Sequence, residues 1–229
     1  MIRGLALIDA PAYVSFRNRA PVNEAITGPS GTASRLGLVD LLGRSALHDP
    51  RRLTWIYIDR GQINGLISVK NRLATDIWDI DHLVPSPAAD RQQVCSELLN
   101  HLVSAAYSEG VQRIFLRVQV DSDAEAASRQ VGFCRYATES IYMLDQELQR
   151  EITAILGSSP QGPVRMRPRR PADHQPLFQL YCSAVPARVR QVEGMTLQEW
   201  RSTDGWRLYP VNWRVGLPSG RRDYVAEDD

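Results

Sequence analysis

The sequence has almost no net charge and no long hydrophobic run. Its 27 Lys and Arg residues balance 26 Asp and Glu residues, which leaves a formal net charge of +1 at pH 7. A chain with so small a net charge has no global field that would steer it to nucleic acid or to an acidic membrane. It also has no apolar run of ~18 residues, the length a membrane-spanning helix requires. We therefore expect no membrane association.

Cysteine is scarce. Cys95, Cys134 and Cys182 are odd in number, and their spacing fits neither a metal site nor a paired disulfide framework. We predict buried free thiols in the reducing cytoplasm and no bound metal. The first apolar run ends at Asp9 and lacks the flanks of a signal peptide. These features together predict a cytoplasmic location.

The 229 residues, 43% of them hydrophobic, allow one large or two small globular domains. Residues 157–163 (GSSPQGP) are rich in Gly, Ser and Pro and are typical of a linker. A short helix is expected just before them. We predict a domain over residues 1–145, a helix and linker over 146–163, and a further domain over 164–229.

The central stretch predicts a strand, a helix and a second strand. Residues 77–84 are apolar on both faces, as parallel strands are. A helix over 94–109 follows, with apolar residues at helical spacing: Cys95, Leu98, Leu99, Leu102, Val103 and Ala106. Gly110 ends that helix, and 114–120 is a β-branched strand. A unit of this length crosses over right-handedly and makes its strands parallel.

The residues before this unit predict further strands and helices. A strand is expected over 2–8, helices over 12–27 and 34–47, and a hairpin with strands over 53–58 and 65–69. Residues 136–144 are expected to supply a last strand or two. The predicted fold class is α/β, with a mixed, mostly antiparallel sheet that has helices on both faces.

The chain then repeats itself loosely. The residues after the linker align with the opening of the chain, so that Arg167 matches Arg3 and Asp173 matches Asp9. Helical patterns broken by a proline follow both. A long-period repeat indicates two copies of one domain, and we predict that 164–229 begins a second, incomplete copy.

The order of motifs in residues 77–133 resembles the acyl-CoA-binding core of the GNAT superfamily of N-acetyltransferases. The resemblance rests on Leu83-Val84-Pro85, a loop, the helix over 94–109, the strand over 114–120, and Gly132-Phe133. It implies the GNAT fold, in tandem copies, and acetyl-CoA as the co-substrate. It also implies a small-molecule or peptide amine as the acceptor.

The loop departs from the family pattern (Q/R)-x-x-G-x-(G/A). Its six positions read Asp90-Arg91-Gln92-Gln93-Val94-Cys95, with an acid first and Gln93 in place of the glycine. That glycine lets a diphosphate approach backbone N–H groups closely. Arg91 could instead contact a phosphate directly. The resemblance assigns cofactor binding to Leu83, Val84, Arg91, Gln93, Val94 and Cys95.

Catalytic candidates also follow from the resemblance. Asp79 and Asp81, with His82, lie on the strand where family members keep a base for the acceptor amine. Alternatively, the two aspartates face solvent and the histidine lies at a sheet edge. Ser128 stands where the family has a tyrosine that acts as general acid, and a serine hydroxyl is a far weaker acid than a phenol.

Three functional hypotheses remain open. The chain is an acetyl-CoA-dependent N-acyltransferase with an atypical loop, or a GNAT-like domain without cofactor binding that has a structural or regulatory function. In the third hypothesis, arginines and tryptophans between 164 and 215 bind single-stranded nucleic acid, although interspersed acids favour a mixed solvated surface. A homodimer is compatible with the first two.

Overall fold

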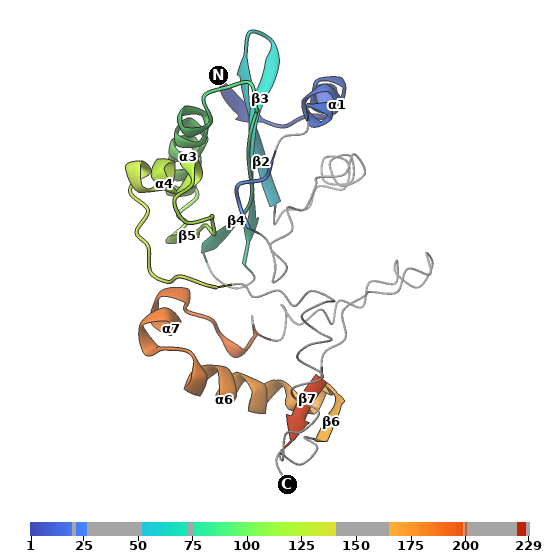
Figure 1. Cartoon of the computed structure of the whole chain (residues 1–229), viewed down its shortest axis with the longest axis vertical. Coiled ribbons are helices and arrows are strands. Elements are labelled where there is room, and N and C mark those ends of the chain that lie inside the picture. The colour runs from blue at the N-terminus through green and yellow to red at the C-terminus, as the bar shows by residue number, and fades with distance from the viewer. Residues whose placement is uncertain are drawn as a thin grey trace, which may run out of the picture. The chain divides into compact units, whose positions relative to one another are not determined.

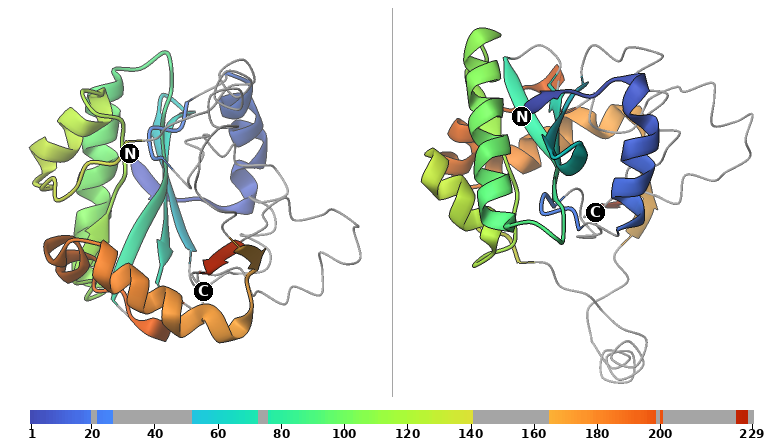
Figure 2. Two further views of the ribbon diagram at one scale, coloured as in Figure 1. Left: turned by 60° about the horizontal axis from the view of Figure 1, so that its bottom comes forward. Right: turned by 90° about the horizontal axis from the view of Figure 1, so that it is seen from above.

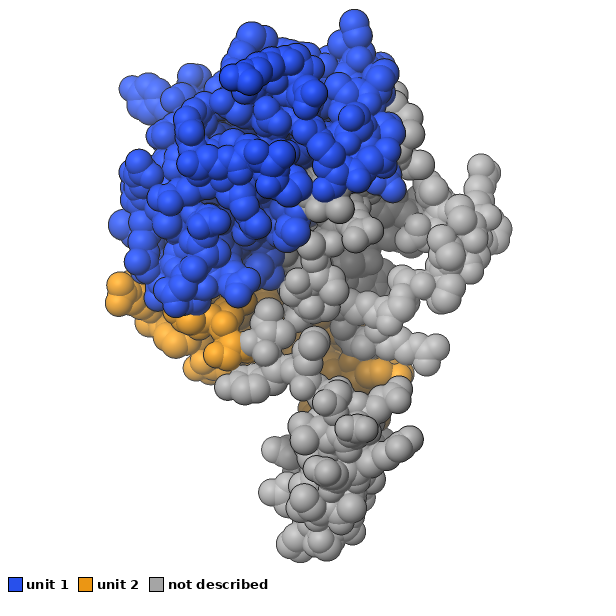
Figure 3. Space-filling view, turned by 45° about the horizontal axis from the view of Figure 1, so that its top comes forward, with its two compact units in different colours: residues 1–135 blue, residues 136–229 orange. Residues whose placement is uncertain are grey.

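The computed structural model describes residues 1–19, 22–26, 52–72, 76–140, 165–198, 200 and 224–227. The chain divides into two compact units, residues 1–135 and residues 136–229, which Figure 3 colours blue and orange. The predicted linker over 146–163 lies outside the described residues, as does the predicted helix over 34–47. Each unit is described below by itself.

A five-stranded mixed sheet forms the centre of the first unit (Figure 1). The strands follow chain order across the sheet, and all neighbours are antiparallel except the last pair, β4 and β5, which is parallel. The predicted mixed α/β fold is therefore confirmed. The strands are β1 (Ile2–Gly4), β2 (Arg52–Asp59), β3 (Gln62–Asn71), β4 (Ile77–Pro85) and β5 (Arg113–Phe115).

Helices cover both faces of this sheet. Figure 2 shows α1 (Ala10–Asn18) on one side and α3 (Arg91–Ser108) with α4 (Asp123–Val131) on the other. Two buried clusters follow from this arrangement, because successive side chains of a strand point to opposite faces. Leu66 packs with α1, whereas its neighbour Ile67 packs with α3. β3 is therefore buried on both faces.

The predicted apolar stripe of α3 is buried at every position except Val103, which is 38% exposed. The helix begins at Arg91, three residues earlier than predicted, because Asp90 caps it. It ends before Gly110, whose φ of +70° is a left-handed conformation that glycine adopts without strain. The sequence had predicted this end of the helix.

The opening of the chain differs from the prediction. Only Ile2–Gly4 is a strand, and Leu7–Asp9 forms a short 3₁₀ helix. The Asp9 carboxylate accepts a hydrogen bond from the Ala6 backbone N–H at 2.9 Å and binds Arg3, which turns the chain. The helix predicted over 12–27 is shorter than expected: α1 covers Ala10–Asn18.

The end of the first unit also has less regular structure than predicted. The strand expected over 114–120 pairs with β4 only through Phe115, and Val118 forms an isolated bridge with Ala25. Residues 136–140, where a further strand was expected, contain none. The remainder of that predicted segment, 141–144, lies outside the described residues.

The second unit opens with the same local arrangement as the first. β6 (Arg165–Pro168) leads to a short 3₁₀ helix (Pro171–Asp173) and then to α6 (His174–Ala184) and α7 (Ala187–Glu193). β6 pairs antiparallel with β7 (Tyr224–Glu227). From Arg165 on, the described residues of the second unit thus repeat the strand, 3₁₀ helix and longer helix with which the first unit begins, and the identity of the second unit as a GNAT-like copy stays a prediction.

An arginine–aspartate pair accompanies this arrangement in each unit. Arg3 donates to Asp9 at 2.7 Å and Arg167 donates to Asp173 at 2.7 Å, across six residues in both cases. Each aspartate also accepts a backbone N–H three residues before it. The side-chain hydrogen bond from Arg3 lowers the pKa of Asp9, and that from Arg167 lowers the pKa of Asp173.

We predict that Gly65→Ala destabilises the first unit. A Cβ at Gly65 would lie 2.6 Å from Cγ1 of Val94 and 3.0 Å from Cδ1 of Leu98, on the buried face of α3. Val94 is β-branched and stiff, so β3 and α3 must move apart, at a cost of about 1–3 kcal/mol. Urea unfolding measures the change. Gly4→Ala is the control, because nothing lies within 4 Å of its added Cβ, and equal stability of the two variants would contradict the prediction.

Candidate functional site

The candidate site lies at the carboxyl ends of the parallel strands β4 and β5. Their register pairs Ile77 with Arg113 and ends where Asp79 pairs with Phe115. α3 begins just after β4, so its first turn opens at the same end of the sheet. Ligands of open α/β sheets bind in the crevice outside the carboxyl ends of the strands.

A segment from the beginning of the chain lies next to β4 (Figure 1), beyond the point where the pairing of β4 with β5 ends. The Glu24 N–H donates to the Leu83 carbonyl of β4 at 2.7 Å, and the Ile26 N–H donates to the Arg117 carbonyl at 2.9 Å. Ala25 forms a bridge with Val118. Residues 23–26 therefore connect β4 to the chain that follows β5.

The side chain of Asn23 fixes this segment. Its Oδ1 accepts the backbone N–H of Leu83 at 2.9 Å and that of Ala25 at 3.1 Å, and its Nδ2 donates to the Asp81 carbonyl at 3.2 Å. Ala25 is 1% exposed and packs in the core on the α3 side of the sheet. Both backbone polar groups of Leu83 are thus hydrogen-bonded to the segment.

Asp90 occupies the N-terminus of α3. Its carboxylate accepts the Gln93 N–H at 3.1 Å, and its carbonyl accepts the Val94 N–H at 3.0 Å. The Gln93 side chain donates to Glu97 at 3.2 Å and so lies along the exposed surface of the helix. A carboxylate of the chain therefore takes the place at the helix N-terminus that favours an anion.

Arg91, the candidate phosphate ligand, is bound to acids of the chain. Its guanidinium forms an ion pair with Glu24, and its Nε lies 3.9 Å from Oδ2 of Asp123. With Asp90, three carboxylates lie around the first turn of α3, which has a single arginine. A diphosphate here would be repelled by like charges. The residues of this crevice do not fit the acetyl-CoA that the sequence resemblance implies.

The remaining cofactor candidates are packed in the core. Leu83, Val84, Val94 and Cys95 are all buried, with Val84 the most exposed of the four at 7%. Leu83, Val94 and Cys95 lie together on the α3 side of the sheet, whereas Val84 packs on the α1 side. The structure thus brings together Leu83, Arg91, Val94 and Cys95 and separates the side chain of Val84 from them.

The two candidate base residues are engaged in ion pairs. Asp79 binds Arg72 through both oxygens, at 2.8 and 2.9 Å. Asp81 binds Arg52 of β2 and lies 3.1 Å from Nδ1 of His82. His82 pairs with Ser68 of β3 and lies beyond the end of the pairing with β5, but it is 4% exposed, so the expectation of a histidine at an open sheet edge is wrong.

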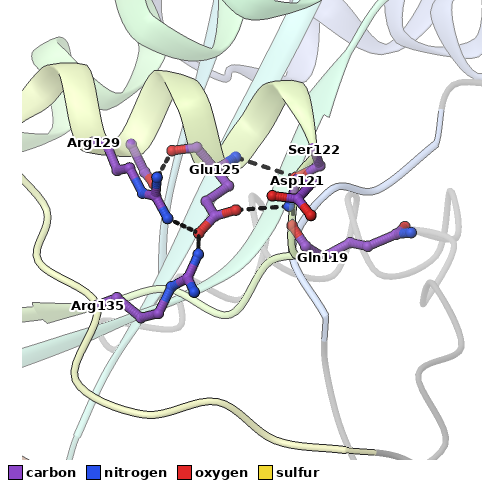
Figure 4. A network of polar contacts seen from close by, with 7 residues as sticks. Gln119, Asp121, Ser122, Glu125, Arg129 and Arg135 are labelled. Atoms are coloured by element: carbon purple, nitrogen blue, oxygen red, sulfur yellow. Dashed lines mark hydrogen bonds and ion pairs between the residues drawn. The ribbon is translucent and has the colours of Figure 1, made fainter.

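Ser128 has a structural contact. Its hydroxyl donates to the Glu125 carbonyl one turn earlier in α4, at 2.8 Å, and its side chain is buried. Figure 4 shows the neighbouring network around the Glu125 carboxylate, which accepts from Arg129 at 2.8 Å, from Arg135, and from the Asp121 N–H at 2.7 Å. No role was predicted for Glu125, although Ser122-x-x-Glu125 is a capping-box pattern in the sequence.

Glu125 holds the loop between β5 and α4 in shape. Asp121 has φ of +59°, a left-handed conformation that is uncommon for residues other than glycine. The carboxylate of Glu125 binds the N–H of this residue directly. The hydrogen bond from Arg135 is the main cause that lowers the pKa of Glu125, and the Asp121 N–H adds to it.

Comparisons with known proteins agree with this fold. The model of the acetyltransferase (GNAT) family matches residues 24–133. The GNAT domain of S. lividans PAT is similar to the chain with a TM-score of 0.50 and 19% identity, over 61% of this chain and 85% of that one. At this identity the similarity shows the fold alone. No curated protein sequence matches the chain.

Two further solved structures are similar at lower scores. The ribosomal-protein-S18-alanine N-acetyltransferase from Escherichia coli has 21% identity and a TM-score of 0.46, over 60% of this chain and 79% of that one. An acetyltransferase from Trypanosoma brucei has 18% identity and a TM-score of 0.46, over 63% and 98%. Among the described residues, no helix is long and apolar enough to cross a membrane.

We predict that Cys95 is inert toward thiol reagents. Burial raises its pKa to about 12 from the ordinary 9.0, so its thiolate population at pH 8 falls about 1,000-fold. Ellman's reagent, applied to variants that each keep one cysteine, measures the rates. Cys134 is the control: it is exposed and Cys182 is half-buried, so the prediction that all three thiols are buried holds only for Cys95. Similar rates for the two thiols in the folded protein would contradict the prediction, whereas in denaturant the rates should converge.

We predict that Glu125→Gln weakens the pH dependence of stability in acid. Because the pKa of Glu125 is lowered on folding, its contribution is full above the unfolded value of about 4.3 and is lost as pH falls through the folded value. The variant should therefore be less stable than the parent at pH 7, with a smaller difference at about pH 3.5.

Urea midpoints at the two pH values test this expectation. Glu109→Gln is the matched control, since Glu109 is exposed at the end of α3. A difference between Glu125→Gln and the parent that is equally large at both pH values would show that the carboxylate does not act through its charge.

Proposed function

The chain belongs to the GNAT superfamily of acetyltransferases, and we propose that residues 1–135 are a non-catalytic member with a structural or regulatory function. The family chemistry is acetyl transfer from acetyl-CoA to a primary amine. We place that chemistry outside this domain. One observation carries the proposal: the crevice at the carboxyl ends of β4 and β5 is filled by residues 23–26 of the same chain.

Charge supports the same proposal. Asp90 caps α3, and Glu24 binds Arg91, so the first turn of that helix is already occupied by carboxylates. The contacts of the catalytic candidates agree with the proposal. Asp79 and Asp81 are ion-paired, and Ser128 is buried with its hydroxyl bound to a backbone carbonyl. Position 128 therefore has no phenol that would protonate the thiolate leaving group of acetyl transfer.

The structure also bears on nucleic-acid binding by the second unit. Arg167 is bound to Asp173 at 2.7 Å and to Glu227 at 2.6 Å. A guanidinium paired with two carboxylates contributes little to a phosphate-binding surface. This contact favours the mixed, solvated surface over the nucleic-acid hypothesis.

Titration calorimetry with acetyl-CoA tests the proposal. We expect no saturable heat from the full chain at ligand concentrations up to ~1 mM, because anion repulsion and the filled crevice both oppose binding. The same sample should show slow reaction of Cys95, which establishes that the unit is folded. Saturable binding with a micromolar Kd would support catalysis by this domain and overturn the proposal.

A further inference from the structure

Residues 23–26 are hydrogen-bonded to β4 and to the chain that follows β5. The N–H groups of three successive residues are satisfied there, by the Leu83 carbonyl for Glu24, by Asn23 Oδ1 for Ala25, and by the Arg117 carbonyl for Ile26. The Leu83 N–H is satisfied in return by Asn23 Oδ1. Leu83 and Arg117 are distant from the segment along the sequence, so these contacts depend on the tertiary fold.

The insertion spans both parts of the crevice. Its backbone lies between Leu83 and Arg117, and the carboxylate of Glu24, only 10% exposed, reaches Arg91 in the first turn of α3. A linear ligand with an anionic end at that helix and an extended chain along Leu83 would need the same positions. The segment therefore supplies backbone N–H groups that bind β4 and the chain after β5, and a carboxylate that binds Arg91 of α3.

We infer that residues 23–26 are an intramolecular plug in a slot that accepts an extended, amide-bearing chain. Asn23 anchors the plug and the Glu24–Arg91 ion pair latches it. The inference rests on the proposed function, because it assigns the lack of acetyl-CoA binding to a contact within the chain. It goes further because it states that the slot binds such a chain once residues 23–26 have left it.

The chemistry of the plug makes it replaceable. Ala25 is its buried side chain, and a single methyl group removes little apolar surface from water. The other contacts are hydrogen bonds that amides of a ligand can make equally well. Pantetheine, which carries two amides and no phosphate, is the probe that tests the slot without the acidic surroundings of α3.

The test variant is Asn23→Ala combined with Glu24→Gln, which removes the anchor and the latch. The matched control is Asn100→Ala combined with Glu109→Gln, the same residue types at exposed positions of α3 and its end. Two quantities are measured on the full chain: amide hydrogen exchange of Glu24, Ile26 and Leu83, and calorimetric binding of pantetheine and of acetyl-CoA.

We expect the parent and the control to protect these three amides and to bind neither ligand. In the test variant the protection should fall at least ~10-fold, and pantetheine should bind with a Kd at least ~10-fold below the highest concentration at which the parent shows no binding. Amides of β2 and β3 should keep their protection, which shows that the sheet is intact.

The outcomes separate the plug from the proposed function. Unprotected Glu24 and Ile26 amides in a parent that binds no acetyl-CoA would overturn the plug, and the non-catalytic proposal would then rest on the absent binding and on the carboxylates around α3. A test variant with released amides that binds no pantetheine would also overturn the plug and leave the non-catalytic proposal standing. If the parent binds acetyl-CoA and loses protection of these amides on binding, the plug stands and the non-catalytic proposal fails. Binding by the parent with the amides still protected overturns both.

Discussion

The backbone of Leu83 is the constraint on which the candidate site depends. Its N–H and its carbonyl lie at the end of β4 where the pairing with β5 has stopped, and unpaired backbone groups in a buried position are costly. Asn23 and Glu24 satisfy both groups from the beginning of the chain. The open crevice of an α/β sheet has thereby become a closed part of the core, and Ala25 packs inside it.

Electrostatics around α3 follow from the same closure. Once Glu24 is held beside the helix, Arg91 has an acidic partner within the chain, and Asp90 has taken the Gln93 N–H. A helix N-terminus attracts one anion well, and further carboxylates repel the next. The charges that stabilise the helix here are those that an anionic ligand would have to replace. Stability of the closed site and affinity for a diphosphate therefore oppose each other at this turn.

The sequence predicted the part of the fold that local patterns control. Apolar spacing predicted α3, and Gly110 predicted where it ends, because period and backbone conformation are properties of neighbouring residues. The same patterns could show that Gln93 and Asp90 depart from an anion-binding loop.

Local patterns could not show what fills the crevice, since Asn23 contacts Leu83 across 60 residues and no periodic signal marks such a contact. The burial of His82 was missed for a related reason, because it depends on tertiary contacts at the end of β4 that no local pattern marks.

The repeated arginine–aspartate pair illustrates the difference between these two kinds of contact. Arg3 and Asp9, like Arg167 and Asp173, are six residues apart, and each pair lies where a strand is followed by a 3₁₀ helix, although Arg167 also binds Glu227 of β7. Such a device can be recognised in sequence wherever it recurs. A plug that joins residues 23–26 to β4 and to the chain after β5 has no such local code, so the local arrangement at the opening of the first unit implies nothing about whether its crevice is filled. Fold and ligand access are thus specified by different residues in this chain, and membership of an acetyltransferase family fixes only the first.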